Sequence, residues 1–172
     1  MQYKKNQKEI FKIYKLKELC DIKYGKSIEA NKLSFNCKFK VYGGNGVIGT
    51  LDTYDHINYK ISISCRGAAS GKVILTEPYS TISSNSLFLN LFDEKHFFNI
   101  LMFLKNANLS NIATGSAQPQ ITIANIEDLE IKIYNNFDNS IYEKLIKIKS
   151  QTYAKITILN KLKQTYLCKF FK

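Results

Sequence analysis

The chain has 172 residues, of which 45% are hydrophobic, and it carries a formal net charge of +11. This length and apolar content are typical of one folded domain with an appendage and exclude a disordered chain. The first twenty residues are rich in lysine and no run of eighteen apolar residues occurs, so we expect neither a secretion signal nor a membrane span.

The first half of the chain predicts a series of short strands joined by turns. Residues 11–21 form an irregular pattern that fits an entry strand or a short helix. The apolar runs 39–42 and 47–51 flank Gly43–Gly46, where Asn45-Gly46 would supply the positive φ values of a hairpin turn. Residues 61–65 alternate apolar and serine, which predicts a half-buried strand before a small-residue loop at 67–71 and a further strand at 73–75.

The second half adds a helix and a polar loop. Residues 87–91 alternate as a strand, whereas the dense apolar residues of 97–104 fit a buried helix. Residues 111–120 contain several amide and hydroxyl groups and little apolar bulk, as in a loop that carries recognition. Residues 129–133 then predict the last strand of the domain.

A long helix is predicted from Ser140 to Lys172, a stretch without Gly or Pro. Ser140 lies three residues before Glu143, which is the spacing of a capping box. Apolar residues recur at alternating steps of three and four, as in a coiled coil, with an interruption at Lys155. The residues of this seam are Leu145, Ile148, Thr152, Leu159, Leu162 and Tyr166. The alternative is a terminal helix folded back on its own domain.

The positive charge is unevenly distributed along the chain. Residues 1–20 carry +4 and residues 139–172 carry +7, from eight lysines against Glu143 alone. Between them, residues 21–72 carry +4 and residues 73–138 carry −4. A DNA-facing surface would draw on the basic part of the domain, because neutralised phosphates release counterions. The other interpretation is that these lysines only solvate the surface.

Taken in order, several segments resemble the target-recognition domain and spacer helix of type I restriction-modification DNA specificity subunits. The matching segments are Lys15-Leu16-Lys17-Glu18-Leu19-Cys20, residues 41–49, 61–67, 71–73, Ser84-Asn85, residues 115–120 and 129–133, and Leu162-Lys163-Gln164-Thr165-Tyr166-Leu167. Their order and spacing carry the resemblance, which covers nearly the whole chain. The family's full subunit has two recognition domains and two helices, so this chain resembles a half-subunit.

The resemblance implies an α+β fold: a single recognition domain with mixed β-structure at 1–138 and a long coiled-coil helix at 139–172. It implies double-stranded DNA as ligand and methyltransferase subunits as partners on the helix, with a restriction subunit as a further partner. S-adenosylmethionine would be bound by the methyltransferase, and this chain would hold no cofactor. Two copies would pair their helices antiparallel as a homodimer, which predicts an interrupted palindromic target.

Side-chain chemistry suggests individual DNA contacts within the domain. The lysines expected to contact phosphates are Lys26, Lys32, Lys38, Lys40 and Lys72. The side chains able to contact base edges are those of Asn45, Arg66, Ser116, Gln118 and Gln120. Arg66 is the only arginine, and a buried structural pair is its alternative role. Asn45 has the alternative role of a turn former.

Catalytic and metal-binding patterns are missing from the sequence. There is no N-P-P-Y-like tetrapeptide, no phosphate-binding G-x-x-x-x-G-K-[ST] and no H-E-x-x-H. Glu130-Ile131-Lys132 has a nuclease-like E-x-K spacing but lies on an alternating strand. Four isolated cysteines indicate reduced thiols in the cytoplasm. Two other functions remain open: a free-standing DNA-binding regulator or antirestriction factor, and a protein that binds its partner through the basic helix.

Overall fold

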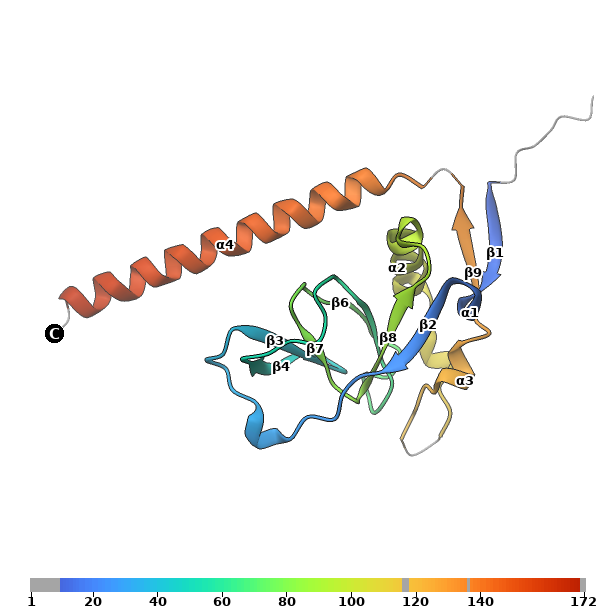
Figure 1. The fold of residues 1–172 in the computed structure, drawn as a ribbon, viewed down its shortest axis with the longest axis horizontal. Helices are drawn as coiled ribbons and strands as arrows, with labels where there is room; N and C mark the ends of the chain where they lie inside the picture. Colours follow the sequence, from blue (N-terminus) through green and yellow to red (C-terminus); the bar gives the residue numbers. More distant parts are fainter. Residues whose placement is uncertain (1–9, 116–117, 136, 171–172) are drawn as a thin grey trace, which may run out of the picture. The chain divides into compact units, whose positions relative to one another are not determined.

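The computed structural model describes residues 10–115, 118–135 and 137–170. The chain divides into two units, a mixed α/β domain and a C-terminal helix (Figure 1). The boundary between them in the sequence lies after Asn135. Within the described residues, no helix is long and apolar enough to cross a membrane.

Residues 11–21 were predicted to form either a strand or a short helix, and the structure contains both. Strand β1 (Phe11–Lys15) is followed by a one-turn helix α1 (Leu16–Leu19) and strand β2 (Cys20–Tyr24). β1 pairs antiparallel with β9 (Glu130–Tyr134), so the first and last strands of the domain lie side by side (Figure 1). Ile131 and Ile133 are buried while Glu130 and Lys132 are exposed, which confirms the alternation predicted for this strand.

The main sheet has four antiparallel strands in the order β2-β8-β5-β6. β8 spans Ser86–Leu91, β5 spans Ile61–Ser64 and β6 spans Val73–Leu75. The prediction that β5 is half-buried is wrong, because Ser62 and Ser64 are also fully buried. Their small hydroxyl side chains let a second layer pack on that face, where an added Cβ at Gly44 would lie only 2.6 Å from Ser64 Oγ.

A second sheet has three strands in the order β4-β3-β7. β3 (Phe39–Gly43) and β4 (Gly46–Leu51) form the predicted hairpin, and β7 (Thr81–Ile82) pairs parallel with β3. Gly43 pairs with Gly46, so the two turn residues are Gly44 and Asn45. Gly46 has a φ of +135°, but Tyr79 is the only non-glycine with positive φ among the described residues, so Asn45 does not adopt the predicted positive φ.

Helix α2 (Phe97–Asn106) confirms the buried helix predicted for residues 97–104, and its residues Ile100 and Leu104 are fully buried in the main core. A one-turn helix that the sequence did not predict, α3 (Ile123–Ile126), begins after Thr122, whose side chain accepts a hydrogen bond from Asn125 N. Short 3-10 turns lie at Ala30–Lys32, Glu94–His96 and Leu109–Ile112. The core therefore lies between the main sheet, α2 and the β1–β9 pair.

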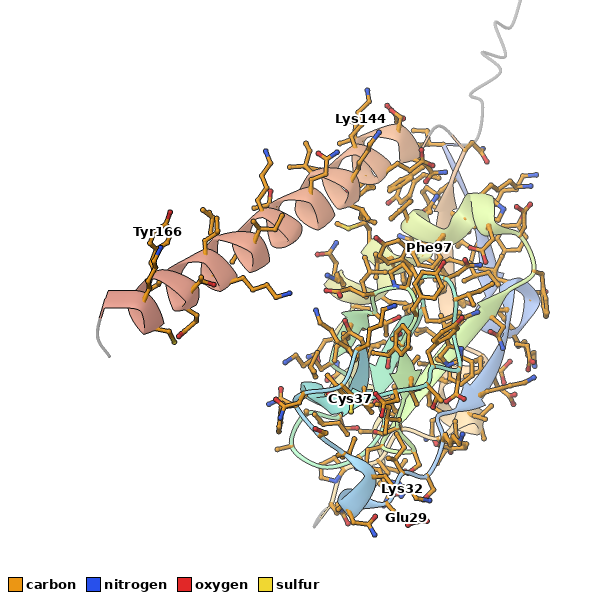
Figure 2. The ribbon with its side chains drawn as sticks, turned by 60° about the vertical axis from the view of Figure 1, so that its left-hand side comes forward. Glu29, Lys32, Cys37, Phe97, Lys144 and Tyr166 are labelled. Atoms are coloured by element: carbon orange, nitrogen blue, oxygen red, sulfur yellow. The ribbon has the colours of Figure 1, made fainter. Side chains whose placement is uncertain are left out.

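Helix α4 runs from Asn139 to Phe170, 32 residues, or about 48 Å at about 1.5 Å per residue. The predicted capping box of Ser140 and Glu143 is wrong, because Ser140 lies inside the first turn and donates through its backbone N–H to Asp138 Oδ1 at 2.9 Å. Hydrogen bonds from the Ser140 hydroxyl and backbone hold the pKa of Asp138 below its ordinary value. Lys144 and Tyr166 project from this helix in Figure 2.

Candidate nucleic-acid interface

The β3–β4 turn lies against the end of strand β5 because residue 44 has no side chain. An added Cβ at Gly44 would lie 2.6 Å from Ser64 Oγ and 3.6 Å from Asn85 O. Glycine at this position therefore allows the backbone of the turn to approach the main sheet closely. As a consequence, Asn45 is held at the edge where the two sheets meet.

The β5–β6 loop, residues 65–72, forms the second wall. Within it Ser70 N donates to Gly67 O at 2.9 Å, and Gly71 N donates to Ser64 O at 2.9 Å. Gly67 and Gly71 have φ values of +74° and +91°, which other residues adopt only with strain. An added Cβ at Gly71 would also lie 2.9 Å from Ser110 N, so the loop depends on glycine for its close packing.

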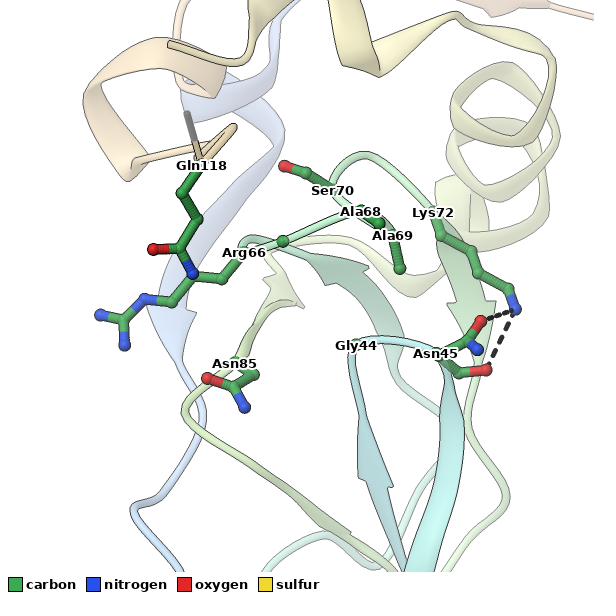
Figure 3. Close-up of a pocket in the computed structure, with 10 residues that line it drawn as sticks. Gly44, Asn45, Arg66, Ala68, Ala69, Ser70, Lys72, Asn85 and Gln118 are labelled. Atoms are coloured by element: carbon green, nitrogen blue, oxygen red, sulfur yellow. Dashed lines mark hydrogen bonds between the residues drawn. The ribbon is translucent and has the colours of Figure 1, made fainter. Parts of the chain in front are cut away.

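A third segment, residues 118–121, runs antiparallel to the start of that loop. Ile121 N donates to Cys65 O at 3.0 Å, and Gly67 N donates to Pro119 O at 3.2 Å. The backbones of Arg66 and Gln120 form a β-bridge between these bonds. Two distant parts of the sequence are thus joined by backbone hydrogen bonds, which brings the side chain of Gln118 to the same side as that of Arg66 (Figure 3).

These segments enclose an open cleft with a volume of about 910 Å³, which we call the hairpin cleft (Figure 3). Its lining residues are Gly44, Asn45, Arg66, Gly67, Ala68, Ala69, Ser70, Lys72, Asn85 and Gln118. None of these ten described residues is acidic, whereas two are cationic and three carry side-chain amides. Its chemistry therefore suits a ligand that is anionic or rich in hydrogen-bond acceptors.

Four of the ten residues predicted to contact DNA line this cleft: Asn45, Arg66, Lys72 and Gln118. Gln120 lies beside it, and its backbone exchanges two hydrogen bonds of 2.8 Å with Thr114. Ser116 lies outside the described residues. The structure therefore brings together most of the side chains predicted to contact base edges.

The remaining predicted lysines lie away from the cleft. Lys26 is 3.5 Å from Asp55, and Lys32 is 3.0 Å from Glu29 on the 3-10 turn seen in Figure 2. Lys40 Nζ lies 2.8 Å from both carboxylate oxygens of Glu77. Lys38 is exposed, with its ammonium group 5.2 Å from the centre of the Phe39 ring.

Asn85 is a cleft residue to which the sequence assigned no role. Cys65 N donates to its backbone oxygen at 3.0 Å, which fixes the residue at the cleft edge. The Ser84-Asn85 pair was one segment of the family resemblance, and this was the only signal that could have identified it. Its exposed amide can donate to and accept from a base edge.

The thiol of Cys65 lies beneath the cleft as a structural group. Burial raises its pKa, and the adjacent Arg66 charge opposes this effect only in part. A protonated buried thiol is a poor nucleophile. Among the described residues there is also no group of three or more His, Cys, Asp or Glu side chains placed to hold a metal ion.

Comparisons with protein families and with solved structures both find specificity subunits of type I restriction-modification systems. Residues 8–165 match the type I restriction modification DNA specificity domain family. No curated protein matches the chain. The fold is similar to that of the S subunit of a type I restriction-modification system from M. genitalium, with a TM-score of 0.73 and 22% identity, over 96% of this chain and 47% of that one.

Two further solved structures show the same fold at lower similarity. The HsdS subunit from Thermoanaerobacter tengcongensis matches with a TM-score of 0.56 and 16% identity, over 93% of this chain and 41% of that one. A chain from a study of type I system assembly matches with a TM-score of 0.53 and 12% identity, over 98% and 45%. The chain thus spans less than half the length of each of these relatives.

Proposed function

Because this chain belongs to the family of type I restriction-modification DNA specificity domains, we propose that it recognises one half of a bipartite DNA target through the hairpin cleft. The observation that carries the proposal is the convergence of Asn45, Arg66 and Gln118 on one cleft whose described lining has no acidic residue. Amides and guanidinium groups are the side chains that contact base edges most specifically.

In this proposal the lysines outside the cleft fix the protein on the phosphate backbone. Lys38 is the best placed of them, because the residue is exposed and no carboxylate of the described residues lies within salt-bridge distance of its ammonium group. Lys26 and Lys32 would exchange exposed acidic neighbours for phosphates, and exposed ion pairs of this kind are weak. Lys40 would have to leave a carboxylate that it contacts through both oxygens, so we expect it to contribute least.

We propose that residues 1–138 form the recognition domain and that residues 139–172 form a spacer that pairs antiparallel with the same helix of a second copy. All six seam residues named from the sequence are exposed along α4, and Ile156, 46% exposed, offers an apolar group beside the interruption at Lys155. A continuous exposed apolar stripe on a helix favours pairing with another helix. Each copy would then supply one recognition domain.

The same helix would bind the methyltransferase subunits of the system in the cytoplasm. Residues 139–172 carry a charge of +7, so two paired copies would present a strongly basic rod that favours acidic partner surfaces. The methyltransferase would hold S-adenosylmethionine and perform the chemistry, and a restriction subunit would join in a cleaving complex. This chain would act in recognition alone, without a catalytic step.

The test is to purify the full chain alone and together with the modification subunit of its system, and to measure mass by light scattering and binding to duplex DNA. We expect a dimer that carries modification subunits and binds DNA. A chain that stays monomeric at high concentration, alone and with modification subunits and DNA present, would contradict the proposal. DNA binding without any capture of modification subunits would instead favour a free-standing regulator.

A further inference from the structure

One contact in the hairpin cleft changes what its residues can offer to DNA. Lys72 Nζ donates to the side-chain oxygen of Asn45 at 2.7 Å and to the backbone oxygen of the same residue at 3.0 Å (Figure 3). Lys72 is the last residue of the β5–β6 loop and Asn45 lies in the β3–β4 turn, so the contact joins the two sheets at the cleft. The Lys72 ammonium group thus holds both the backbone of the β3–β4 turn and the side-chain amide of Asn45.

The contact leaves Asn45 biased toward donating hydrogen bonds. A side-chain amide has one acceptor oxygen and an NH₂ group with two donors. Here the oxygen already accepts from a cation, and the positive charge beside it disfavours the approach of another donor such as the amino group of adenine or cytosine. The NH₂ group and the third proton of Lys72 remain to meet an acceptor.

A second cationic side chain in the cleft, that of Arg66, adds further donors. Arg66 carries donors only, and none of the described lining residues is an aspartate or glutamate that could accept from an exocyclic amino group. In the major groove, guanine presents two adjacent acceptors, N7 and O6, while adenine presents an acceptor beside a donor. The donors of Lys72, Asn45 and Arg66 therefore favour guanine over adenine, while the amides of Asn85 and Gln118 can either donate or accept.

We propose that Lys72 is a positioning residue that holds Asn45 as a donor, and that together they select a guanine edge in the recognised half-site. This differs from the sequence-independent phosphate contact expected for Lys72 from the sequence. It rests on the proposed function, since it specifies which base the cleft selects.

The experiment is selection of bound duplexes from a random pool with the full chain and its variants, followed by affinity measurements on the selected target and on random DNA. The variants are Lys72→Met, Asn45→Ala and the double variant, with Lys72→Arg as the conservative change that keeps a donor. Lys38→Met is the matched control, because this lysine is exposed but lies outside the cleft. Thermal unfolding of each variant checks that the fold is retained.

We expect the wild-type motif to contain a guanine whose preference falls about tenfold or more in both Lys72→Met and Asn45→Ala, with no further loss in the double variant. Lys72→Arg should keep the preference, and 7-deazaguanine at that position, which lacks the N7 acceptor but keeps O6, should reduce it. Lys38→Met should weaken target and random DNA equally and leave the motif unchanged.

Two results would overturn the inference in different ways. If Lys72→Met weakens target and random DNA equally and keeps the wild-type motif, Lys72 contacts phosphate only and the proposed function stands. If the wild-type chain enriches no motif at all, sequence recognition by this cleft and the role of Lys72 are both wrong.

Discussion

The backbone around Gly25 leaves no room for a side chain. An added Cβ would lie 2.3 Å from Ser83 O and 2.4 Å from Ile82 O, so the neighbouring backbone would have to move. We therefore expect Gly25→Ala to lower the free energy of unfolding by about 1–3 kcal/mol, the usual cost of overpacking. Urea denaturation measures this change, with exposed Ser27→Ala as the control. Equal stability of both variants would show that the segment around residue 82 yields easily.

We expect His56 to make the stability of the domain depend on pH. Its half-buried ring lies 4.6 Å from that of Phe88, and burial, aided by the charge of Lys60, lowers its pKa below the ordinary 6.5. As pH falls below 6.5, the unfolded chain binds a proton that the folded chain does not, so stability present at neutral pH is lost. The aspartates with lowered pKa lose their contributions only at more acidic pH, below their ordinary value of 3.8.

We accordingly predict that the urea midpoint of the wild type falls between pH 7 and pH 5, and that His56→Gln has a flatter profile. His96→Gln, which changes the other histidine, should keep the wild-type slope. A wild-type midpoint that is constant over this range would contradict the assignment.

For individual residues, the sequence shows which side chains have groups that can bind DNA. It does not show which of these groups already contact another residue of the chain. The functional groups of Arg66 and Gln118 predict DNA contacts, and backbone pairing between residues 65–67 and 119–121 brings these two side chains together. The partner of Lys40 is 37 residues away, and that of Lys72 is 27 residues away. No local pattern reveals such contacts.

Among the elements, α4 carries the clearest prediction. If its exposed stripe pairs with a second copy, the change Ile148→Glu or Leu159→Glu would bury an unpaired carboxylate, which costs about 3 kcal/mol or more. We expect the dimer dissociation constant to rise by roughly 100-fold, with helix content retained. Lys161→Gln, on the opposite face, is the control. Sedimentation velocity decides the outcome, and an unchanged dimer in both seam variants would place the interface elsewhere.

Elements with a repeating pattern were predictable and short ones were not. The hairpin strands, α2 and β9 follow from alternation or helical density over five or more residues. β7 has two residues and α3 has four, too few to show a period. The buried serines of β5 resemble a solvent-facing set in sequence, and only the second sheet packed on them makes them interior.

For the whole molecule, helix length should set the distance between the two half-sites. Seven residues added to α4 after Thr152, in register with the seam, would lengthen the spacer by about 10 Å at about 1.5 Å per residue. At about 3.4 Å per base pair this is roughly 3 base pairs. We expect the gap in the recognised motif to grow by that amount while both half-sites stay the same. An unchanged gap would show that the helices do not separate the recognition domains.

The most direct measurement is to map methylated bases in the genome of the host, with and without the gene for this chain. Recognition of a half-site by each of two copies predicts an interrupted palindrome whose methylation disappears on deletion and returns when the gene is restored. A methylation pattern that is identical in both strains would contradict the claim that this chain directs modification.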